Sequence, residues 1–486
     1  MDIDVVIRNG RIIDGTGGPA IAADLGLSGD RIVALGAIPA VPGQTVIDAA
    51  GKAVAPGFID VHTHDDRALL NTPDMAMKVS QGVTTVVVGN CGISLAPLSL
   101  RGAPPAPLDL IGDRADFRYP TFAAYLAALD RSPPALNAAC LAGHTTLRVG
   151  AMDALDRPAT AAEMAAMRTR LGEALEAGAI GLSTGLGYPT AEPAPTAEVK
   201  ALAELLKPAG AIHTTHMRDE SEQVLAALDE AFDIGRSAGV PVVISHHKTA
   251  GRANFGRSRE TLKKIDRAMA SQPIGLDAYP YIASSTVLDP KWIAEADRVF
   301  VTWSKSAPEQ TGRDLADIAK DWGVTPAAAA ERLQPAGAVY FMMDEADVRR
   351  ILSYPHTMIG SDGLPHDTHP HPRLWGTFPR VLGHYCREAK LFPLEEAVRR
   401  MTGLPAQQFR LTNRGVIAVG AYADIVVFDP ATVIDRATFE APMTPAAGID
   451  TVIVNGRIVW RNGAATGARP GRALRRQSLQ AEAARP

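Results

Sequence analysis

The chain has 486 residues, of which 46% are apolar and 21% charged, and its formal net charge is −4. This length allows a large buried core, and the small net charge, without a basic block before the arginines of residues 469–476, gives no support for nucleic-acid binding. No apolar run is long enough to span a bilayer, no secretory signal precedes the first strand pattern, and three cysteines are too few for a disulfide framework, so we expect a soluble, cytoplasmic protein without a membrane or nucleic-acid partner.

Strand patterns at both ends of the chain predict one small β-sandwich. Residues 4–14 contain Asn9-Gly10, which predicts two short strands joined by a hairpin turn. A similar pattern occupies residues 449–460, and residues 424–429 predict a further strand. We assign residues 1–53 and 415–465 to this sandwich and residues 466–486 to a tail, in which the arginine-rich stretch 469–476 is expected to be a frayed terminus.

Between these ends, strand-like and helical segments alternate. Eight apolar runs predict strands within residues 54–61, 82–89, 136–142, 179–183, 211–215, 240–245, 274–278 and 357–360. Segments such as 161–177 and 221–238 have helical spacing. This alternation predicts an α/β fold, a (β/α)₈ TIM barrel over residues 54–414. The long connection from Ala283 to Asp344 is interpreted as an inserted lid.

Side chains that bind metals stand at the predicted carboxyl ends of these strands, where the active sites of such barrels lie. The first strand ends in His62-Thr-His64, and the alternation of strand side chains places both imidazoles on one side. The later strand ends carry Cys91, the pair His213 and His216, the pair His246 and His247, and Asp362. Imidazole and thiolate ligands on one rim predict a zinc site. Alternation alone does not choose between the two members of each later histidine pair.

This pattern resembles the amidohydrolase superfamily, many members of which carry a carbamylated lysine on the fourth strand that bridges two metals. The fourth predicted strand, within residues 178–188, contains no lysine. Cys91 offers a thiolate that can take over the bridging role. Within the superfamily, this substitution is characteristic of the D-aminoacylases (N-acyl-D-amino-acid deacylases). The resemblance covers nearly the whole chain, through residues 185–188, 215–220, 244–248, 278–281, 302–304 and 371–385.

The resemblance implies a ligand set. Cys91, His216 and His246 would form a tight zinc site, and His62 and His64 would share Cys91 in a second, weaker or partly occupied site. His213 and His247 are then interpreted as hydrogen-bonding neighbours of the ligands.

The predicted reaction follows from the metal site. Zinc polarises an amide carbonyl and activates a water molecule, and Asp362 is placed to act as general base and then general acid. Lys248 shares a face with His246, and Arg373 offers a fork suited to a carboxylate. By resemblance, these two cations and Tyr279 would bind the substrate carboxylate, with further donors at Tyr188 and Ser285.

The expected activity is zinc-dependent hydrolysis of small N-acyl-D-amino acids. Two alternatives stay open: a cyclic-amide hydrolase of the dihydroorotase or hydantoinase type, and an inactive barrel that binds metal. The missing fourth-strand lysine weakens the first, and the presence of Asp362 weakens the second. Residues 288–292 are expected to line the pocket for the substrate side chain. There, Lys291 favours acidic side chains and Leu288 and Trp292 favour apolar ones, so the sequence does not decide the preference.

Overall fold

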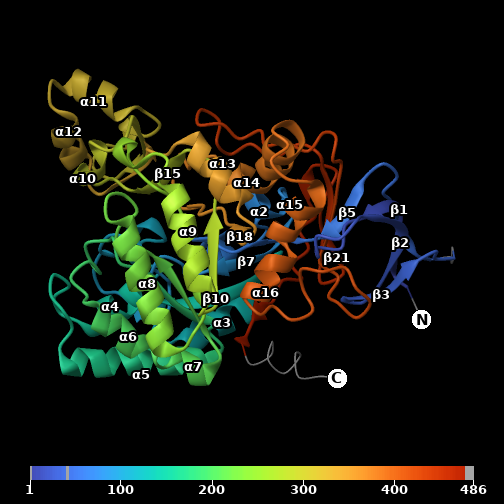
Figure 1. Cartoon of the computed structure of the whole chain (residues 1–486), viewed down its shortest axis with the longest axis horizontal. Coiled ribbons are helices and arrows are strands. Elements are labelled where there is room, and N and C mark those ends of the chain that lie inside the picture. Colours follow the sequence, from blue (N-terminus) through green and yellow to red (C-terminus); the bar gives the residue numbers. More distant parts are fainter. Residues whose placement is uncertain (1–2, 40–42, 477–486) are drawn as a thin grey trace.

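The computed structural model describes residues 3–39 and 43–476, and a parallel barrel occupies its centre (Figure 1). The barrel strands follow in the order β6 (Phe58–Asp60), β7 (Val83–Val88), β10 (Asn137–Gly143), β11 (Gly181–Gly185), β12 (Ile212–His216), β13 (Val242–Ile244), β14 (Ile274–Ala278) and β18 (Thr357–Ile359). A parallel bridge between Thr63 and Gly363 joins the first and last strands beyond their ends. All eight strands lie where the apolar runs predicted them, and the (β/α)₈ fold is confirmed.

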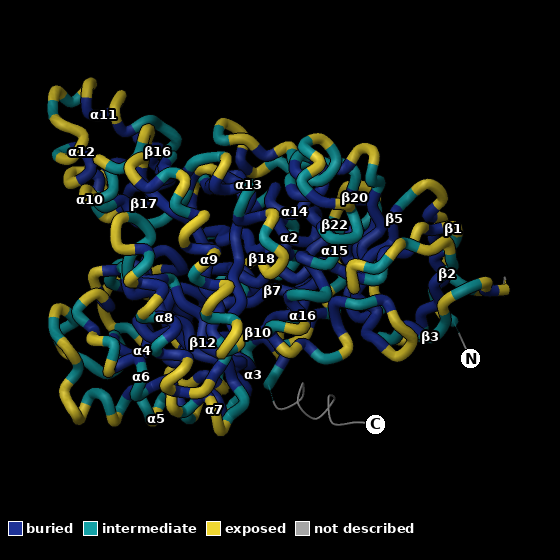
Figure 2. The backbone as a smooth tube through the Cα atoms, in the orientation of Figure 1, coloured by how far each residue is buried: buried dark blue, intermediate teal, exposed yellow. Residues whose placement is uncertain are grey.

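Helices cover the outside of the barrel, and Figure 2 shows buried strands within an outer layer that is exposed toward solvent. The helix predicted over residues 161–177 is α5 (Ala161–Ala177), which begins at a capping box between Thr160 and Glu163. The prediction over residues 221–238 starts too early. Asp219 accepts the N–H groups of Ser221 and Gln223 in a turn, so α8 begins only at Val224.

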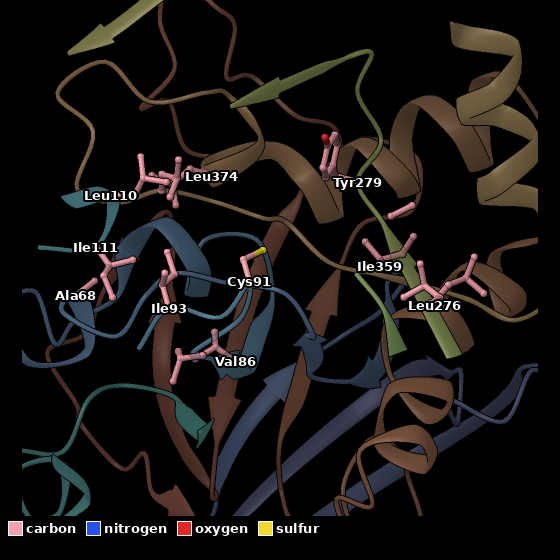
Figure 3. Close-up of a cluster of buried hydrophobic side chains, with 14 of the residues drawn as sticks. Ala68, Val86, Cys91, Ile93, Leu110, Ile111, Leu276, Tyr279, Ile359 and Leu374 are labelled. Carbon is pink, nitrogen blue, oxygen red and sulfur yellow. The ribbon is translucent and has the colours of Figure 1, made fainter. Parts of the chain in front are cut away.

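The remaining barrel helices are short, and several strands are followed by two of them. They are α1 (Ala68–Asn71), α2 (Ala76–Val79), α3 (Phe122–Arg131), α4 (His144–Ala151), α6 (Thr196–Ala203), α7 (Leu206–Ala209), α9 (Ser258–Met269), α13 (Glu345–Ser353), α14 (Arg373–Arg380), α15 (Leu394–Met401) and α16 (Gly403–Gln408). Apolar side chains between strands and helices form the core, and Figure 3 shows part of it around Cys91.

The strand predicted over residues 54–61 divides at Pro56-Gly57. β5 (Ala53–Pro56) pairs with β19 (Ile425–Phe428) in a second sheet, whereas β6 enters the barrel. Gly57 is required at the crossing because a Cβ there would lie 2.1 Å from the Thr84 side chain.

Both ends of the chain build this second sheet, which has nine strands (Figure 1). From the start come β1 (Val5–Ile12), β2 (Ile21–Ser28), β3 (Arg31–Gly36), β4 (Thr45–Asp48) and β5. From the end come β19, β20 (Ile449–Val454), β21 (Arg457–Arg461) and β22 (Ala464–Ala465). The expected association of the two termini is confirmed, and the domain limits drawn in the sequence stay predictions.

The two Asn-Gly pairs behave differently. Asn455-Gly456 turns the hairpin between β20 and β21, with φ of +45° and +77°, as such a turn requires. At Asn9-Gly10 only Asn9 has a positive φ, at +59°, and β1 continues through both residues with a bulge in its pairing to β2. The hairpin predicted within residues 4–14 is therefore wrong.

The connection between β14 and α13 folds as a unit. It contains a three-stranded antiparallel sheet of β15 (Ala283–Val287), β16 (Arg298–Ser304) and β17 (Ala336–Phe341), with α10 (Pro290–Ile293), α11 (Leu315–Trp322) and α12 (Pro326–Leu333). In Figure 1 it projects from one end of the molecule.

The predicted fraying from residue 469 is wrong as far as Arg476. β23 (Ala473–Leu474) pairs with β10, and Arg475 forms an ion pair with Asp130. The rest of the predicted tail, residues 477–486, lies outside the described residues. Among the described residues, no helix combines the length and the apolar character needed to cross a membrane.

Candidate active site

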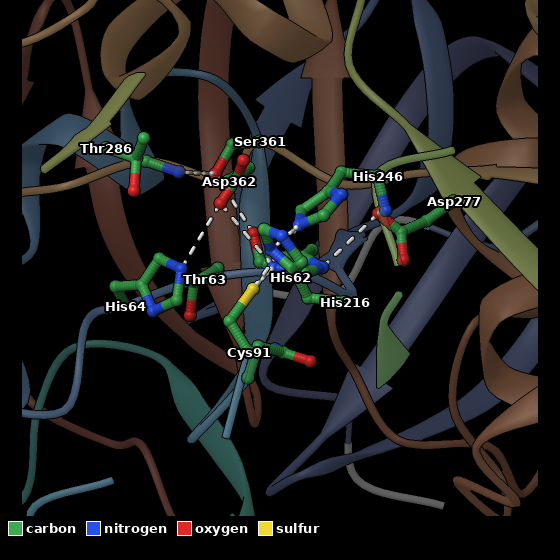
Figure 4. A network of polar contacts seen from close by, with 12 residues as sticks. His62, Thr63, His64, Cys91, His216, His246, Asp277, Thr286, Ser361 and Asp362 are labelled. Carbon is green, nitrogen blue, oxygen red and sulfur yellow. Dashed lines mark hydrogen bonds and ion pairs between the residues drawn. The ribbon is translucent and has the colours of Figure 1, made fainter. Parts of the chain in front are cut away.

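Three side chains meet at the carboxyl end of the barrel. The Cys91 Sγ atom lies 3.2 Å from His62 Nε2 and 3.3 Å from His246 Nε2. His246 Nε2 in turn lies 3.0 Å from His216 Nδ1. Figure 4 shows these side chains converging from separate strand ends. The structure thus brings together Cys91, His62 and His246, three of the five residues that the sequence predicts as metal ligands, and it places His216 beside His246.

Backbone strain marks the same place. Cys91, His246 and Asp362 adopt φ of +52°, +34° and +51°, a region that residues other than glycine seldom occupy. Such conformations persist only where the surroundings enforce them, and they concentrate at functional sites.

The spacing and charge of the cluster fit a zinc ion. Zinc bonds of about 2.0–2.3 Å in tetrahedral geometry separate ligand atoms by roughly 3.3–3.6 Å, close to the separations found here. Burial opposes protonation of His62, but Cys91, Asp277 and Asp362 outweigh it and raise its pKa well above the usual value. Burial and Lys248 lower the pKa of His246 to about 3, which leaves its imidazole neutral. The acidic neighbours of His62 thus favour a cation within the buried cluster, and the neutral imidazole of His246 offers a ligand nitrogen.

Asp362 lies between the histidines and a buried arginine. Its Oδ1 atom is 3.2 Å from His64 Nε2 and 3.5 Å from His62 Nε2, and its Oδ2 atom is 3.0 Å from Arg373 Nη2. Burial alone would raise the pKa of Asp362, but Arg373 and the histidines hold it well below its usual value. His64 contacts this carboxylate, and it is not among the residues that cluster around Cys91. The carboxylate is therefore ionised, with Oδ1 directed toward the histidines.

Lys248 is held by Glu220, a residue to which the sequence analysis assigns no role. Its Nζ atom donates to both Glu220 oxygens, at 2.8 and 2.7 Å, and lies 2.8 Å from His246 Nδ1. Glu220 also lies 3.0 Å from His246 Nδ1. The Lys248 ammonium is thus paired with a carboxylate, and Glu220 orients His246. The available signal was the spacing of Glu220 four residues after His216.

Asp277 was likewise missed, although it stands at the end of β14. Its Oδ1 atom accepts the His246 backbone N–H at 2.9 Å and lies 3.4 Å from His62 Nδ1. It therefore positions two members of the cluster.

A cavity of about 290 Å³ opens beside the cluster. It is lined by His64, His216, His246 and Asp362, and by the predicted substrate-binding residues Tyr188, Lys248, Tyr279 and Ser285. Arg373 is not on the wall but packs 4.6 Å from the Tyr279 ring and donates to the Ser285 carbonyl. The insertion contributes Lys291 and Trp292 to the wall, whereas Leu288 is buried and does not line it. The insertion therefore forms part of the cavity wall.

The other two rim histidines point away from the cluster. His213 Nε2 lies 3.0 Å from the Thr184 hydroxyl, and His247 Nε2 lies 2.8 Å from the Thr261 hydroxyl. This placement agrees with the interpretation of both as hydrogen-bonding residues.

The loop from residue 363 to 372 leads from β18 to α14 and contacts the insertion. The His369 N–H donates to the Thr302 carbonyl, and the His371 ring lies 3.1 Å from the Ala283 carbonyl. Asp367 is buried in this loop beside Thr302 and Trp303. Burial, only partly offset by these neighbours, raises the pKa of Asp367 to about 7.

Comparison with known proteins places the chain in a family. Residues 45–272 and 289–460 match the family described as "Amidohydrolase family". A D-aminoacylase of Alcaligenes xylosoxydans xylosoxydans is 56% identical over 97% of this chain and 98% of its own length. The chain is an amidohydrolase of the D-aminoacylase branch. An N-acyl-D-aspartate deacylase of the same organism is 55% identical over 97% of this chain and 95% of its own length.

A solved relative agrees with this amidohydrolase in fold. The N-acyl-D-glutamate deacylase of Bordetella bronchiseptica superposes with a TM-score of 0.94 at 50% identity, over 98% of this chain and 100% of the other. That structure contains zinc and a phosphonate inhibitor that mimics the tetrahedral intermediate of its reaction.

Proposed function

We propose that this amidohydrolase cleaves N-acyl-D-amino acids to a carboxylate and a free D-amino acid, with zinc as cofactor. One observation carries the proposal: the Cys91 thiol lies within 3.3 Å of two imidazole nitrogens, beside an ionised buried aspartate and an open cavity. The D preference is supported by the full-length similarity to enzymes named for D-amino-acid substrates.

Cys91, His216 and His246 are proposed to hold the tight zinc. His62, whose Nε2 atom lies 3.2 Å from the Cys91 Sγ atom, and His64 would hold a second, weaker ion together with Cys91. When bound, zinc polarises the amide carbonyl and lowers the pKa of a water molecule.

Asp362 is proposed to carry the proton. Arg373 engages Oδ2, so Oδ1 is the oxygen that accepts a proton from the attacking water. The same oxygen then donates this proton to the leaving amine nitrogen. Arg373 stabilises the ionised carboxylate for the first step, and the low pKa of Asp362 favours release of the proton in the second.

The substrate carboxylate is proposed to bind between Lys248 and Arg373, with Tyr279 beside both cations. Lys248 and Arg373 lie 5.7 and 4.6 Å from the Tyr279 ring. Lys248 and Tyr279 line the cavity, and Arg373 is buried behind Tyr279. The buried Ser285 hydroxyl has no partner among the described residues and is available as a donor. Tyr188, whose hydroxyl lies 3.1 Å from that of Thr286, is proposed to contact the acyl amide.

The charges of the cavity support a preference for uncharged side chains. Lys291 donates to the Gly187 carbonyl and lies 3.8 Å from Asp289, so it already has acceptors. The wall also includes Asp219 and Glu295, and burial together with Asp219 raises the pKa of Glu295. An acidic substrate side chain would meet these carboxyl groups.

An amine-release assay with zinc tests the proposal. N-acetyl-D-leucine should be hydrolysed faster than N-acetyl-D-glutamate, and N-acetyl-L-leucine and a cyclic ureide should not react. Turnover of the ureide without turnover of any D-substrate would establish the cyclic-amide alternative, and turnover of neither would favour the inactive barrel.

A further inference from the structure

The turn that carries Cys91 reaches across the mouth of the barrel to the fourth strand. β7 pairs with β10 and β10 pairs with β11, so β11 is not a neighbour of β7 in the barrel. The turn nevertheless contacts β11. The Gly92 N–H donates to the Ser183 hydroxyl at 3.0 Å, and the Ser183 hydroxyl donates to the Gly89 carbonyl. Ser183 therefore binds the backbone on both sides of Cys91.

This turn needs an external support because its conformation is unfavourable by itself. Gly89, Cys91 and Gly92 all have positive φ, at +80°, +52° and +75°. Glycine adopts such angles readily, but for a cysteine the left-handed region is disfavoured by the contact of Cβ with the backbone. Since the two hydrogen bonds of Ser183 flank Cys91, they restrain the backbone of Cys91, which would otherwise return to a more favourable conformation.

Glycines on two strands make room for the turn. A Cβ at Gly143, which ends β10, would lie 2.4 Å from the Gly92 carbonyl oxygen. A Cβ at Gly185, which ends β11, would lie 2.1 Å from the Cys91 carbonyl oxygen. Both distances are too short for any side chain, so the turn is packed directly against bare backbone. A longer side chain in place of Ser183 would enter the same space.

We propose that Ser183 is a positioning residue for the metal centre: its hydroxyl clasps the Gly89–Gly92 turn and thereby holds the Cys91 thiolate at the ligand position. The fourth strand then contributes to the centre by placing the cysteine and supplies no ligand of its own. The inference rests on the proposed role of Cys91 as a zinc ligand.

A similar arrangement after the sixth strand supports the proposed role of Ser183. His246, which also has a positive φ, has its backbone N–H bound by the Asp277 carboxylate of the next strand. Two of the proposed ligands are therefore held in left-handed conformations by a polar side chain from another strand.

The test measures zinc affinity of the full-length protein by competition with a chromogenic chelator. Ser183→Ala should bind zinc about 10- to 100-fold more weakly, the range typical for residues that orient metal ligands. Ser245→Ala is the matched control, since Ser245 is a buried serine beside the ligand His246 whose hydroxyl has no partner among the described residues. It should bind zinc like the unchanged protein.

A spectroscopic signal reports on Cys91 directly. In the cobalt-substituted protein, the thiolate-to-cobalt charge-transfer absorption should weaken in Ser183→Ala and stay unchanged in Ser245→Ala. Ser183→Gly, which also removes the hydroxyl and adds no volume, should weaken the same band. This second variant decides the question if Ser183→Ala does not fold.

A double variant separates this inference from the proposed ligand set. In a Cys91→Ala background, Ser183→Ala should cause no further loss of zinc affinity. The proposed role of Ser183 alone would be overturned if Ser183→Ala kept the zinc affinity and the cobalt band of the wild type. It would also be overturned if Ser183→Ala lowered zinc affinity by the same factor in the Cys91→Ala background as in the wild type. An unchanged zinc affinity in Cys91→Ala itself would instead overturn the ligand assignment, and the clasp with it.

Discussion

Replacement of Asp362 by asparagine should separate catalysis from metal binding. The variant keeps the size of the side chain but removes the oxygen that is proposed to accept and return the proton. General acid and base catalysis contributes about 10²- to 10⁴-fold to a rate, so kcat should fall by that factor. Because Cys91, His216 and His246 are unchanged, the tight zinc should be retained.

The same change should also lower stability. Arg373 has no exposed surface, and among the described residues Asp362 is its only acidic partner, at 3.0 Å. Removing one member of a buried pair typically costs about 3–5 kcal/mol, and the retained amide oxygen places the expected loss near 3 kcal/mol. Asp435→Asn is the matched control, because it changes a carboxylate at a similar distance, 3.2 Å, from Arg380, whose side chain is 29% exposed. Solvent can replace part of that contact, so the loss should be smaller than for Asp362→Asn.

The assay combines three measurements on each variant: zinc content, kcat with N-acetyl-D-leucine, and the midpoint of denaturant unfolding. Asp435→Asn should keep its kcat. If Asp362→Asn at full zinc occupancy kept more than a tenth of the wild-type kcat, the proposed role of Asp362 would be refuted.

Three further predictions concern the metal, the substrate carboxylate and the pH. Cys91→Ala should lose the tight zinc in metal analysis, whereas Cys140→Ala, a buried cysteine outside the cluster, should keep it; equal zinc in both would contradict the ligand assignment. Lys248→Met should raise KM for N-acetyl-D-leucine by about 10- to 100-fold, as expected for a lost hydrogen bond to a charged group, and equal weakening with the carboxamide analogue would argue against carboxylate binding. Because burial raises the pKa of Asp367 from 3.8 to about 7, the folded protein binds this proton more tightly than the unfolded chain, and stability falls as the pH rises between these values. Between pH 5 and pH 8, ionisation of Asp367 should lower the free energy of unfolding of the wild type by about 3 kcal/mol. Asp367→Asn cannot ionise and should not show this loss, and parallel pH profiles of the two proteins would contradict the prediction.

The sequence was informative where one local pattern decides the structure. Runs such as Val83–Val88 are apolar and β-branched, which predicts a buried parallel strand, and all eight barrel strands were found in this way. The division at Pro56-Gly57 and the bulge at Asn9 were not predicted, because each depends on which strand lies alongside. Asn455 and Asn9 precede glycine in the same way, yet only the first turns the chain.

The site shows the same limit. Cys91, His62 and His246 could be named from their places at strand ends, because parallel strands bring their carboxyl ends to one rim. The pairing of Lys248 with Glu220 depends on the path of the chain after β12, and the contact of Ser183 with the Cys91 turn joins strands that are not neighbours. The partners of each contact are far apart in the sequence, and no local pattern indicates that they meet.

One measurement tests the central claim most directly. The metal-free protein is mixed with racemic N-acetylleucine, zinc is added stepwise, and the released leucine is resolved by chiral chromatography. We expect no product without zinc and a rate that rises with the first equivalent of zinc. The reaction should stop at half conversion, with only D-leucine released. Release of L-leucine, or the same rate without zinc, would contradict the proposed function.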